Sequence, residues 1–343
     1  MSQFSGPDPQ VAANSGWDEP PARKGFFTDT SICIGCKACE VACKEWNGVP
    51  ADDIAGLNLL GSSYDNTGAL GASTWRHVAF IEQPKQLGTQ TMGAAHTPTG
   101  PAATDALNRA ADDALSGDRS LLGTDSTAVS LGMPSTTLPG ATDPEGRRTD
   151  FRWLMESDVC KHCTHAACLD VCPTGSLFRT EFGTVVVQDE ICNGCGYCVP
   201  ACPFGVIDRR IGDKNTTKNV GIAQKCTLCY DRISAGHEPA CAQACPTKSI
   251  QFGDLDELRT RAAARVEALH DNGYPEARLY LEDPDDGIGG GGAFFLLLDQ
   301  PEVYGLPPDP VVTTHDLPAM WRRAGVAAVG LLAAAAAAFA GSR

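Results

Sequence analysis

Sixteen cysteines, all gathered in four groups of four, are the residues of this chain whose type and spacing could do chemistry. The groups are Cys33-x2-Cys36-x2-Cys39-x3-Cys43, Cys160-x2-Cys163-x4-Cys168-x3-Cys172, Cys192-x2-Cys195-x2-Cys198-x3-Cys202 and Cys226-x2-Cys229-x11-Cys241-x3-Cys245. A cubane 4Fe–4S cluster takes one thiolate per iron. In two-cluster ferredoxins, three closely spaced cysteines hold one cluster and a fourth ligates the other. Sixteen thiolates therefore predict four 4Fe–4S clusters with no cysteine left over.

Two other uses of cysteine fit the spacing less well. Disulfide scaffolds are usually short chains with cysteines spread through loops, whereas neighbours two residues apart are better placed to converge on one metal centre. Zinc sites normally close with two Cys-x2-Cys pairs and a variable spacer, unlike four groups of four. A structural zinc protein or cysteine-rich binding module is nevertheless the alternative from another functional class. His162 and His165 lie inside the second group, and we expect surface residues or partner contacts there because every cluster is already supplied.

Small and basic residues within the groups could support the clusters. Gly35, Gly194 and Gly196 leave the backbone free to fold tightly and to aim N–H groups at cluster sulfurs, which tunes the potential. Four lysines could offset the negative charge of the clusters or serve only solubility, and the sequence leaves both open: Lys37, Lys44, Lys161 and Lys225.

No substrate site accompanies the cysteines in the sequence. There is no nucleophile–base pair, phosphate-binding glycine loop or isolated metal triad, and residues 287–292 are not a dinucleotide fingerprint because they lack the strand–helix context. A chain with redox centres and no substrate site is expected to carry electrons between two partners. We therefore expect no catalytic residues of its own.

Short elements must position the groups. Segments rich in β-forming residues flank them at 75–81, 184–187 and 249–253. Three groups end in a cysteine–proline step, at Cys172-Pro173, Cys202-Pro203 and Cys245-Pro246. The recurrence of cysteine group, proline and strand is an internal repeat. Farther along, the composition predicts a helix at 255–269, a linker at 282–292, a buried strand at 293–299 and an extended connection at 301–318.

Composition and charge restrict the partners. The 343 residues exceed one typical domain, and a net charge of −15 with a pI near 4.8 argues against nucleic acid, whose binding needs a basic face. The N-terminal residues are polar and lack the apolar core of a secretory signal peptide. Residues 86–148 are rich in Gly, Ala, Thr, Ser and Pro, which predicts a loop-like or disordered insertion with His96 as a solvated histidine.

An uninterrupted apolar run of Ala, Gly, Val, Leu and Phe occupies residues 324–340, between Trp321, Arg322 and Arg323 on one side and Arg343 on the other. A helix of this run alone would be roughly 25 Å long, and the flanking residues bring it to the lower limit of a membrane span. The interfacial Trp and Arg favour a transmembrane helix at 321–341. A buried Ala-rich helix that packs on a soluble partner is the alternative.

The motifs resemble the four-cluster ferredoxin-type subunits of molybdopterin oxidoreductases, and in particular the beta subunit of respiratory formate dehydrogenase. The segments that carry the resemblance are CIGCKACEVACKEWN from Cys33, DVCKHC from Asp158, CNGCGYCVPACPFGV from Cys192, KCTLCYDRISAGHEPACAQACPTKSI from Lys225 and VYGLP from Val303. A single apolar helix follows the last of these. The similarity covers residues 25–85 and 150–340, and the insertion departs from it.

In that family the groups pair crosswise, and the resemblance implies the same ligand sets here. Cluster 1 would use Cys33, Cys36, Cys39 and Cys245, and cluster 2 would use Cys226, Cys229, Cys241 and Cys43. Cluster 3 would use Cys160, Cys163, Cys168 and Cys202, and cluster 4 would use Cys192, Cys195, Cys198 and Cys172.

The fold expected from this pairing is α+β, with two ferredoxin-like domains that each hold two 4Fe–4S clusters and are related by the internal repeat, plus a loop-rich insertion and a C-terminal hydrophobic helix. The first domain would combine 25–87 with 205–255 and the second would comprise 150–204. The insertion would be 88–149, a connecting segment 256–318 and the transmembrane helix 321–341.

The resemblance also implies partners. Electrons would come from a molybdopterin-containing catalytic alpha subunit that oxidises formate and would leave to a membrane cytochrome b or similar gamma subunit. The terminal helix would keep the protein at the cell membrane. Arg322 and Arg323 favour a cytoplasmic globular part, whereas respiratory members work outside the membrane, so the side stays open.

Two relatives are weighed against this assignment. In nitrate reductase beta subunits a tryptophan replaces one cysteine of the third group, whereas Cys195 is intact here. Dimethyl sulfoxide and polysulfide reductase subunits keep all sixteen cysteines but usually lack the terminal helix, and they are the alternative assignment.

Overall fold

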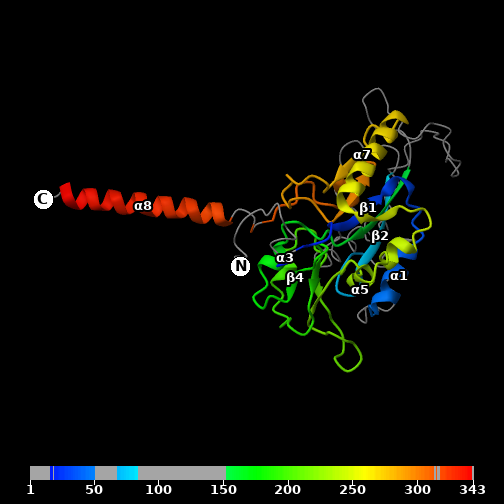
Figure 1. The fold of residues 1–343 in the computed structure, drawn as a ribbon, viewed down its shortest axis with the longest axis horizontal. Coiled ribbons are helices and arrows are strands. Elements are labelled where there is room, and N and C mark those ends of the chain that lie inside the picture. The colour runs from blue at the N-terminus through cyan, green and yellow to red at the C-terminus, as the bar shows by residue number, and fades with distance from the viewer. Residues whose placement is uncertain are drawn as a thin grey trace, which may run out of the picture.

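A computed structural model describes residues 16, 17, 19–50, 68–83, 152–312, 314 and 317–341. The predicted insertion at 88–149, with His96, lies outside these residues. Figure 1 shows a globular part from which one long helix projects.

A four-stranded sheet forms the centre of the globular part. Its strands, in spatial order, are β8 (Ile250–Asp254), β1 (Lys24–Asp29), β10 (Ala293–Leu297) and β9 (Arg278–Tyr280). β1 pairs antiparallel with β8 and parallel with β10, so the sheet joins the start of the chain to two distant segments. The predicted strands at 249–253 and 293–299 are confirmed.

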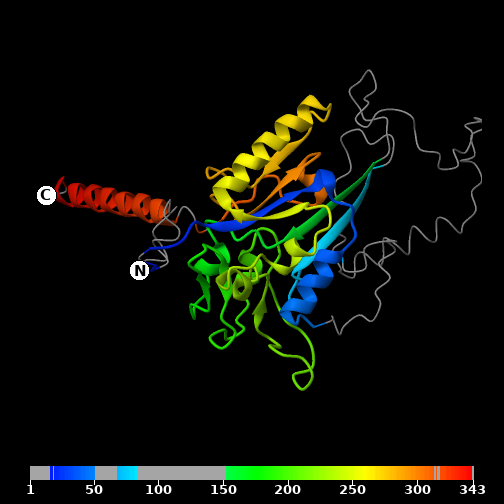
Figure 2. The same ribbon diagram turned by 45° about the vertical axis from the view of Figure 1, so that its right-hand side comes forward.

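Burial explains why β10 is a continuous apolar run. All five of its residues are buried, as expected for a strand covered on both faces. Phe27 and Phe294 stack with their ring centroids 5.3 Å apart. Helix α7 (Leu255–Asp271) contributes Leu255, Leu258 and Ala262 to the same core, which confirms the predicted helix at 255–269. In Figure 2 this yellow helix lies along one side of the sheet, and the cysteine-bearing segments lie on the other.

Residues 256–318 are more than a connection. They supply α7, β9 and β10 to the central sheet, and the short helix η4 (Pro301–Tyr304) follows. The predicted linker at 282–292 connects β9 to β10; its first residues are partly or fully exposed, whereas 288–292 are buried. It bonds to the second cysteine group, because Thr164 N donates to Gly290 O and His165 N donates to Ile288 O. Glycines permit this approach, since a Cβ on Gly289 would lie 2.5 Å from the His165 ring.

A two-stranded antiparallel ribbon lies beneath the sheet. It consists of β2 (Arg76–Gln83) and β3 (Arg152–Val159), in a register from Arg76 opposite Val159 to Gln83 opposite Arg152. β2 confirms the strand predicted at 75–81. The ribbon ends immediately before Cys160 and contacts α1 (Ala38–Asn47), so it links the first two cysteine groups.

The remaining elements are short and surround the cysteines. They are η2 (Thr30–Ile32), α3 (Ala167–Asp170), β4 (Leu177–Arg179), β5 (Val185–Val187), α4 (Cys198–Ala201), β6 (Asp208–Arg209), β7 (Ala223–Gln224), α5 (Tyr230–Ser234) and α6 (Ala240–Gln243). β4 pairs with β5 and β6 pairs with β7. A small apolar core beneath α3 and α4, which includes Leu177, Val185 and Ile207, is separate from the main one.

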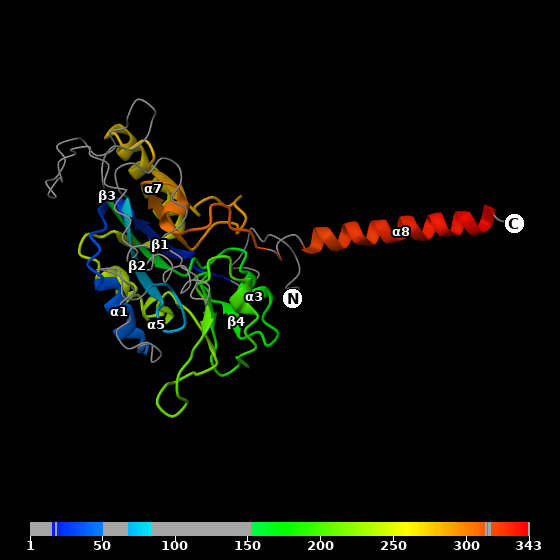
Figure 3. The same ribbon diagram turned by 180° about the vertical axis from the view of Figure 1, so that it is seen from behind.

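The terminal helix α8 (Leu317–Gly341) stands away from the rest of the protein, as Figures 1 and 3 show. Its 25 residues give a length of about 37 Å, which exceeds the roughly 30 Å of a bilayer's hydrocarbon core. The side chains from Met320 to Ala340 are exposed, including Leu331, Leu332 and Phe339. Within the described residues, this is the one helix long and apolar enough to cross a membrane.

Candidate metal centres

The four cysteine groups share a local backbone conformation. The residue before the second cysteine has a positive φ in each group: 64° at Gly35, 45° at His162, 73° at Gly194 and 59° at Leu228. This left-handed step reverses the backbone between the first two cysteines and turns both side chains toward the same space. At Gly194 only glycine fits, because a Cβ would lie 2.5 Å from Gly221 O.

A cavity beside α1 is lined by cysteines from two distant groups. Cys33, Cys36 and Cys39 of the first group line it together with Cys245, the last cysteine of the fourth group. Val78, Ser157 and Ile250 close its sides. We refer to these four cysteines as set 1. About 300 Å³ inside this cavity and its mouth is not filled by protein atoms.

A second cavity repeats this arrangement beside α3. Cys160, Cys163 and Cys168 of the second group line it together with Cys202, the last cysteine of the third group, and these four form set 3. About 370 Å³ inside the cavity and its mouth is free of protein atoms. Its other walls include Val185, Ile207 and Phe204, so the thiols face an apolar interior.

The other eight cysteines also lie in two groups of four. Burial raises the pKa of Cys43, and Cys226, Cys241 and Cys229 raise it further by charge repulsion, which marks these as neighbours. We refer to these four as set 2. Likewise, burial raises the pKa of Cys198 to about 11, and charge repulsion from Cys192, Cys172 and Cys195 contributes to the rise. We refer to these four cysteines as set 4.

The four sets lie in a row. Successive sets are neighbours, because a thiol of one set raises the pKa of a thiol in the next by charge repulsion. The pairs are Cys39 with Cys241 for sets 1 and 2, Cys226 with Cys160 for sets 2 and 3, and Cys168 with Cys198 for sets 3 and 4. Most of the thiols are buried or half-buried, whereas one at each end of the row is exposed: Cys36 in set 1 and Cys195 in set 4. The arrangement can therefore carry charge from one surface of the protein to another.

Hydroxyl and amide groups surround the sulfurs. Ser157 Oγ lies 3.2 Å from Cys39 Sγ, and Ser176 Oγ lies 3.3 Å from Cys172 Sγ. Partial burial raises the pKa of Cys172, but the hydrogen bonds from Ser176, Leu177 N and Thr174 outweigh it and hold the pKa at about 7. Asn47 Nδ2 lies 3.7 Å from Cys43 Sγ and 3.8 Å from Cys229 Sγ. Such donors stabilise thiolate charge, and hydrogen bonds to sulfur set the potential of a cluster.

The predicted lysines differ in burial. Lys161 is fully buried, where its Nζ pairs with Asp158 and lies 4.6 Å from the centre of the Phe295 ring. Lys225 is buried and donates to the carbonyls of Val185 and Cys226. Its charge counteracts the rise that burial causes in the pKa of Cys168. These two cannot serve solubility, whereas Lys37 and Lys44 are partly exposed.

His162 corrects one expectation. It is 1% exposed and is therefore no surface residue. Its Nδ1 accepts a hydrogen bond from Val185 N at 3.1 Å, and its ring lines the cavity of set 3. Burial, followed by repulsion from Lys225 and Arg23, holds the pKa of His162 well below its ordinary value, so the imidazole is neutral. His165 is only half-buried and packs against Gly289.

The sequence did not single out Arg76, although it is fully buried between sets 1 and 2. The sequence held a weak signal. Arg76, Val78 and Phe80 are every second residue of the predicted strand and therefore lie on one face of it. Both faces of that strand carry apolar residues, so alternation alone did not reveal which one meets the cysteines.

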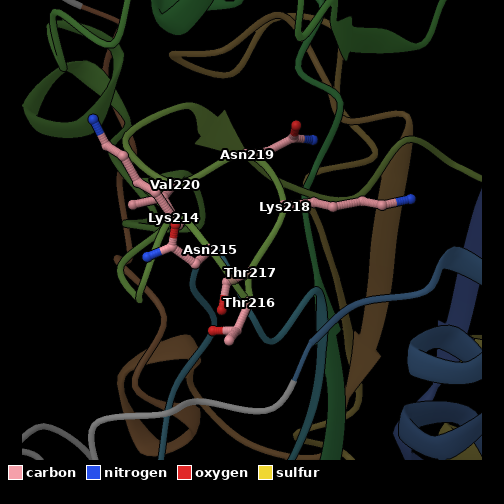
Figure 4. A pocket seen from close by; sticks show the side chains of 7 residues that line it. All are labelled: Lys214, Asn215, Thr216, Thr217, Lys218, Asn219 and Val220. Atoms are coloured by element: carbon pink, nitrogen blue, oxygen red, sulfur yellow. The ribbon is translucent and has the colours of Figure 1, made fainter.

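A hollow outside the cysteine sets lies in the loop between β6 and β7 and is lined by residues 214–220. Figure 4 shows the side chains of Lys214 and Lys218 pointing away from each other, so their charges do not converge on it. This loop offers no second centre.

Comparison with known proteins agrees with the geometry. Two models, each described as a 4Fe-4S dicluster domain, match residues 32–176 and 151–255. The nitrate-inducible formate dehydrogenase iron-sulfur subunit of Escherichia coli is 33% identical over 311 residues, 89% of this chain and 79% of that relative. The protein belongs to the formate dehydrogenase iron–sulfur subunit family. The Haemophilus influenzae formate dehydrogenase iron-sulfur subunit is 32% identical over 88% of this chain and 76% of its own length.

Membership in this family decides between the alternatives. The dicluster matches identify iron–sulfur clusters of the 4Fe–4S type as the cofactors, so the zinc and disulfide alternatives are wrong. The B subunit of the anaerobic dimethyl sulfoxide reductase of Escherichia coli is 43% identical over only 102 residues, 30% of this chain. The formate dehydrogenase iron–sulfur subunits match almost the whole chain, whereas this reductase subunit shares a part of it.

Proposed function

We propose that this chain is a non-catalytic subunit that passes electrons through four 4Fe–4S clusters, one in each cysteine set. The observation that carries the proposal is that three cysteines of one group and the last cysteine of another line a single cavity, in set 1 and again in set 3. Crosswise pairing of this kind holds two clusters side by side.

The residues around each set fit such a group. Four thiols face a space closed mainly by apolar side chains, and hydroxyl, amide and cationic groups are available to offset negative charge. When bound, each cluster supplies a one-electron carrier. The chain contributes ligands from well-packed elements, which limits movement of the sulfurs, and it excludes water from the inner sets. Burial and repulsion raise the pKa of buried thiols such as Cys43 and Cys163, so these thiols release protons on binding metal.

The row of sets gives the relay a direction. Set 1 ends at an exposed surface with Cys36 and the exposed Ile34 and Val41, which suits a protein partner. Set 4 ends at the exposed Cys195 and Tyr197. Thr314 Oγ1, just before α8, donates to Asp170 in α3, next to Cys168 and Cys172. This contact supports a membrane partner on the side of sets 3 and 4 and a catalytic partner on the side of set 1.

The partners follow from the family. The catalytic partner would be a molybdenum or tungsten pterin subunit that oxidises formate, and the acceptor a cytochrome b or similar quinone-reactive membrane subunit. α8, which leaves the globular part near α3 and β4 in Figures 1 and 3, would span the membrane beside that acceptor. The protein would thus be anchored at the cell membrane, on a side that the two arginines before the helix do not determine.

Two ferredoxin-like units account for the pairing. Groups one and four would form the first unit, from 25–87 with 205–255, and groups two and three the second, from 150–204. Residues 256–318 would extend the first unit, since β9 and β10 join the sheet of β1 and β8. The shared left-handed step before the second cysteine of every group supports an origin by internal repeat.

Metal analysis and co-purification test this function together. We expect about sixteen irons per chain under anaerobic conditions, a reduced-cluster paramagnetic resonance signal, and a partner that oxidises formate. A co-purified partner that reduces a sulfoxide or polysulfide and ignores formate would move the protein to the reductase branch, to which part of the sequence is similar. Protease protection in right-side-out vesicles would assign the side of the membrane.

A further inference from the structure

Arg76 lies where the first two cysteine sets meet. It is the first residue of β2 and is 2% exposed, although arginine is rarely buried unless it is paired. Its Nη1 donates to the carbonyl and the hydroxyl of Ser157, at 3.1 and 3.0 Å. Its guanidinium carbon lies 4.9 Å from the centre of the Phe26 ring. These contacts fix the guanidinium in one position.

In the part of the chain that the structure describes, no carboxylate balances the charge of Arg76. Among the residues that the structure describes, no acidic oxygen forms an ion pair with it, and Nε and Nη2 have no oxygen partner. The side chain instead lies beside Cys241, where its charge and a hydrogen bond to the sulfur oppose the rise that burial causes in the pKa of that thiol. Burying an unpaired charge is strongly unfavourable, so a buried arginine of this kind needs another source of negative charge.

With clusters bound, the cysteine sulfurs are thiolates and would supply that negative charge. Burial lowers the pKa of Arg76, but the sulfurs of Cys241, Cys39, Cys226 and Cys43 outweigh burial and raise it above its ordinary value. Three of these sulfurs belong to set 2 and one to set 1. Ser157 extends the contact, because its hydroxyl bonds to Arg76 and lies 3.2 Å from Cys39 Sγ.

We propose that Arg76 is the shared counter-ion of the clusters in sets 1 and 2 and that its charge raises the reduction potentials of both. This inference rests on the proposed function, which gives each set a cluster. A cluster gains one negative charge on reduction, and a fixed cation beside it stabilises the reduced form more than the oxidised form. The interior position makes the effect large, because water screens it little.

The geometry also explains why this residue is an arginine. A planar guanidinium presents donors in several directions, so it can hold Ser157 through Nη1 while Nε and Nη2 remain available to sulfur. Cations also lie beside set 3, where Lys225 and Arg179 oppose the rise that burial causes in the pKa of Cys168 and Cys163. Arg76 differs from them because its charge acts on sulfurs of two sets. Arg76 thus acts on the first half of the relay as a positioning and potential-setting residue.

Redox titration of the purified complex tests the proposal. The reduced-cluster signals of sets 1 and 2 would be followed by paramagnetic resonance in wild type, Arg76→Gln and Arg76→Lys. At the wild-type midpoint, the ratio of reduced to oxidised cluster should fall about tenfold in R76Q for both sets, which is about 59 mV for a one-electron couple. R76K keeps the charge and should stay within about threefold of wild type.

Arg210→Gln is the matched control, because Arg210 is also buried but donates to the carbonyls of Ala72 and Lys218. It should leave the potentials of sets 1 and 2 unchanged. Unaltered potentials in an iron-replete R76Q, or equal shifts in R76Q and R76K, would overturn the counter-ion role.

Iron content decides the case in which R76Q does not assemble. Loss of iron from R76Q with retention in R76K supports a need for the positive charge, whereas equal loss from both, with R210Q intact, would make Arg76 a space-filling residue. If wild type itself lacked an iron–sulfur signal, the proposed function would fail, which is a separate result.

Discussion

Exchanging single ligands tests the crosswise pairing most directly. Cys245 lines the cavity of set 1 although it follows Cys241 of set 2 by only four residues. Crosswise ligation predicts that Cys245→Ser damages the cluster shared with Cys36. Ligation within one group would instead damage the cluster shared with Cys229.

The size of the effect follows from the composition of the sets. Under the proposed ligation, each set of four thiols would hold one cluster with four irons, so loss of one cluster would remove about four irons from about sixteen per chain. Because the inner sets are buried and held by separate elements, the remaining three clusters should persist. The Cys43→Ser variant should lose the same number of irons, but from set 2.

Spectra of paired variants identify the damaged cluster. The reduced-state signal that changes in Cys245→Ser should be the one that changes in Cys36→Ser, and Cys43→Ser should match Cys229→Ser. Thr247→Ala is the control, because its hydroxyl lies 3.7 Å from Cys245 Sγ without being a ligand, and it should keep all its iron. A Cys245→Ser signal that matches Cys229→Ser would refute crosswise pairing.

Three further predictions concern assembly, anchoring and stability. Burial raises the pKa of Cys168 to about 12, so its thiol is protonated at neutral pH and must lose that proton to bind iron. Cluster incorporation into the metal-free protein should therefore rise between about pH 7 and pH 9. An iron content independent of pH would contradict this prediction. Leu331→Arg introduces a charge in the middle of α8, which costs about 2.5–3.5 kcal/mol and should make membrane insertion of the helix roughly 70- to 400-fold less favourable. Ala340→Arg, at the end of the helix, is the control and should have little effect. Both are measured as the fraction of full-length protein that stays in carbonate-washed membranes, and equal retention would argue against a span. Phe295→Ala, in the buried β10, should lower the free energy of unfolding by about 3–5 kcal/mol in anaerobic denaturant titration, while the half-exposed Phe178→Ala should cost much less.

Local pattern was sufficient for several elements. Three elements were predictable because each shows the residue pattern typical of its structure: the strand of Val78, the helix that begins at Leu255, and the buried strand of Phe294 and Phe295. The acidic and glycine-rich composition of 282–292 predicted a linker, and the segment connects β9 to β10, but the burial of 288–292 was not predictable from composition. Its glycines in fact allow the backbone to approach the second cysteine group closely.

The burial of single polar residues was not predictable in the same way. His162 sits between two cysteines in a polar-looking stretch, and nothing local indicates that Val185 N will bond to its ring. Arg76 resembles the exposed charge of an edge strand until Ser157 and four distant cysteines enclose it. Both environments come from residues far apart in the sequence, so they depend on tertiary contacts.

The sequence by itself determined the chemistry of this protein: the number and spacing of thiolates set the kind of cofactor, and an unbroken apolar run predicted the terminal helix. Ligand type and hydrophobic length are local properties, and the chain carries them wherever it folds. Only the tertiary structure decided which sets lie next to one another, which ends of the row reach the surface and which cation is enclosed between sets 1 and 2. Those features arise because β1, β8 and β10 pair across the length of the chain and bring its first and last cysteine groups together.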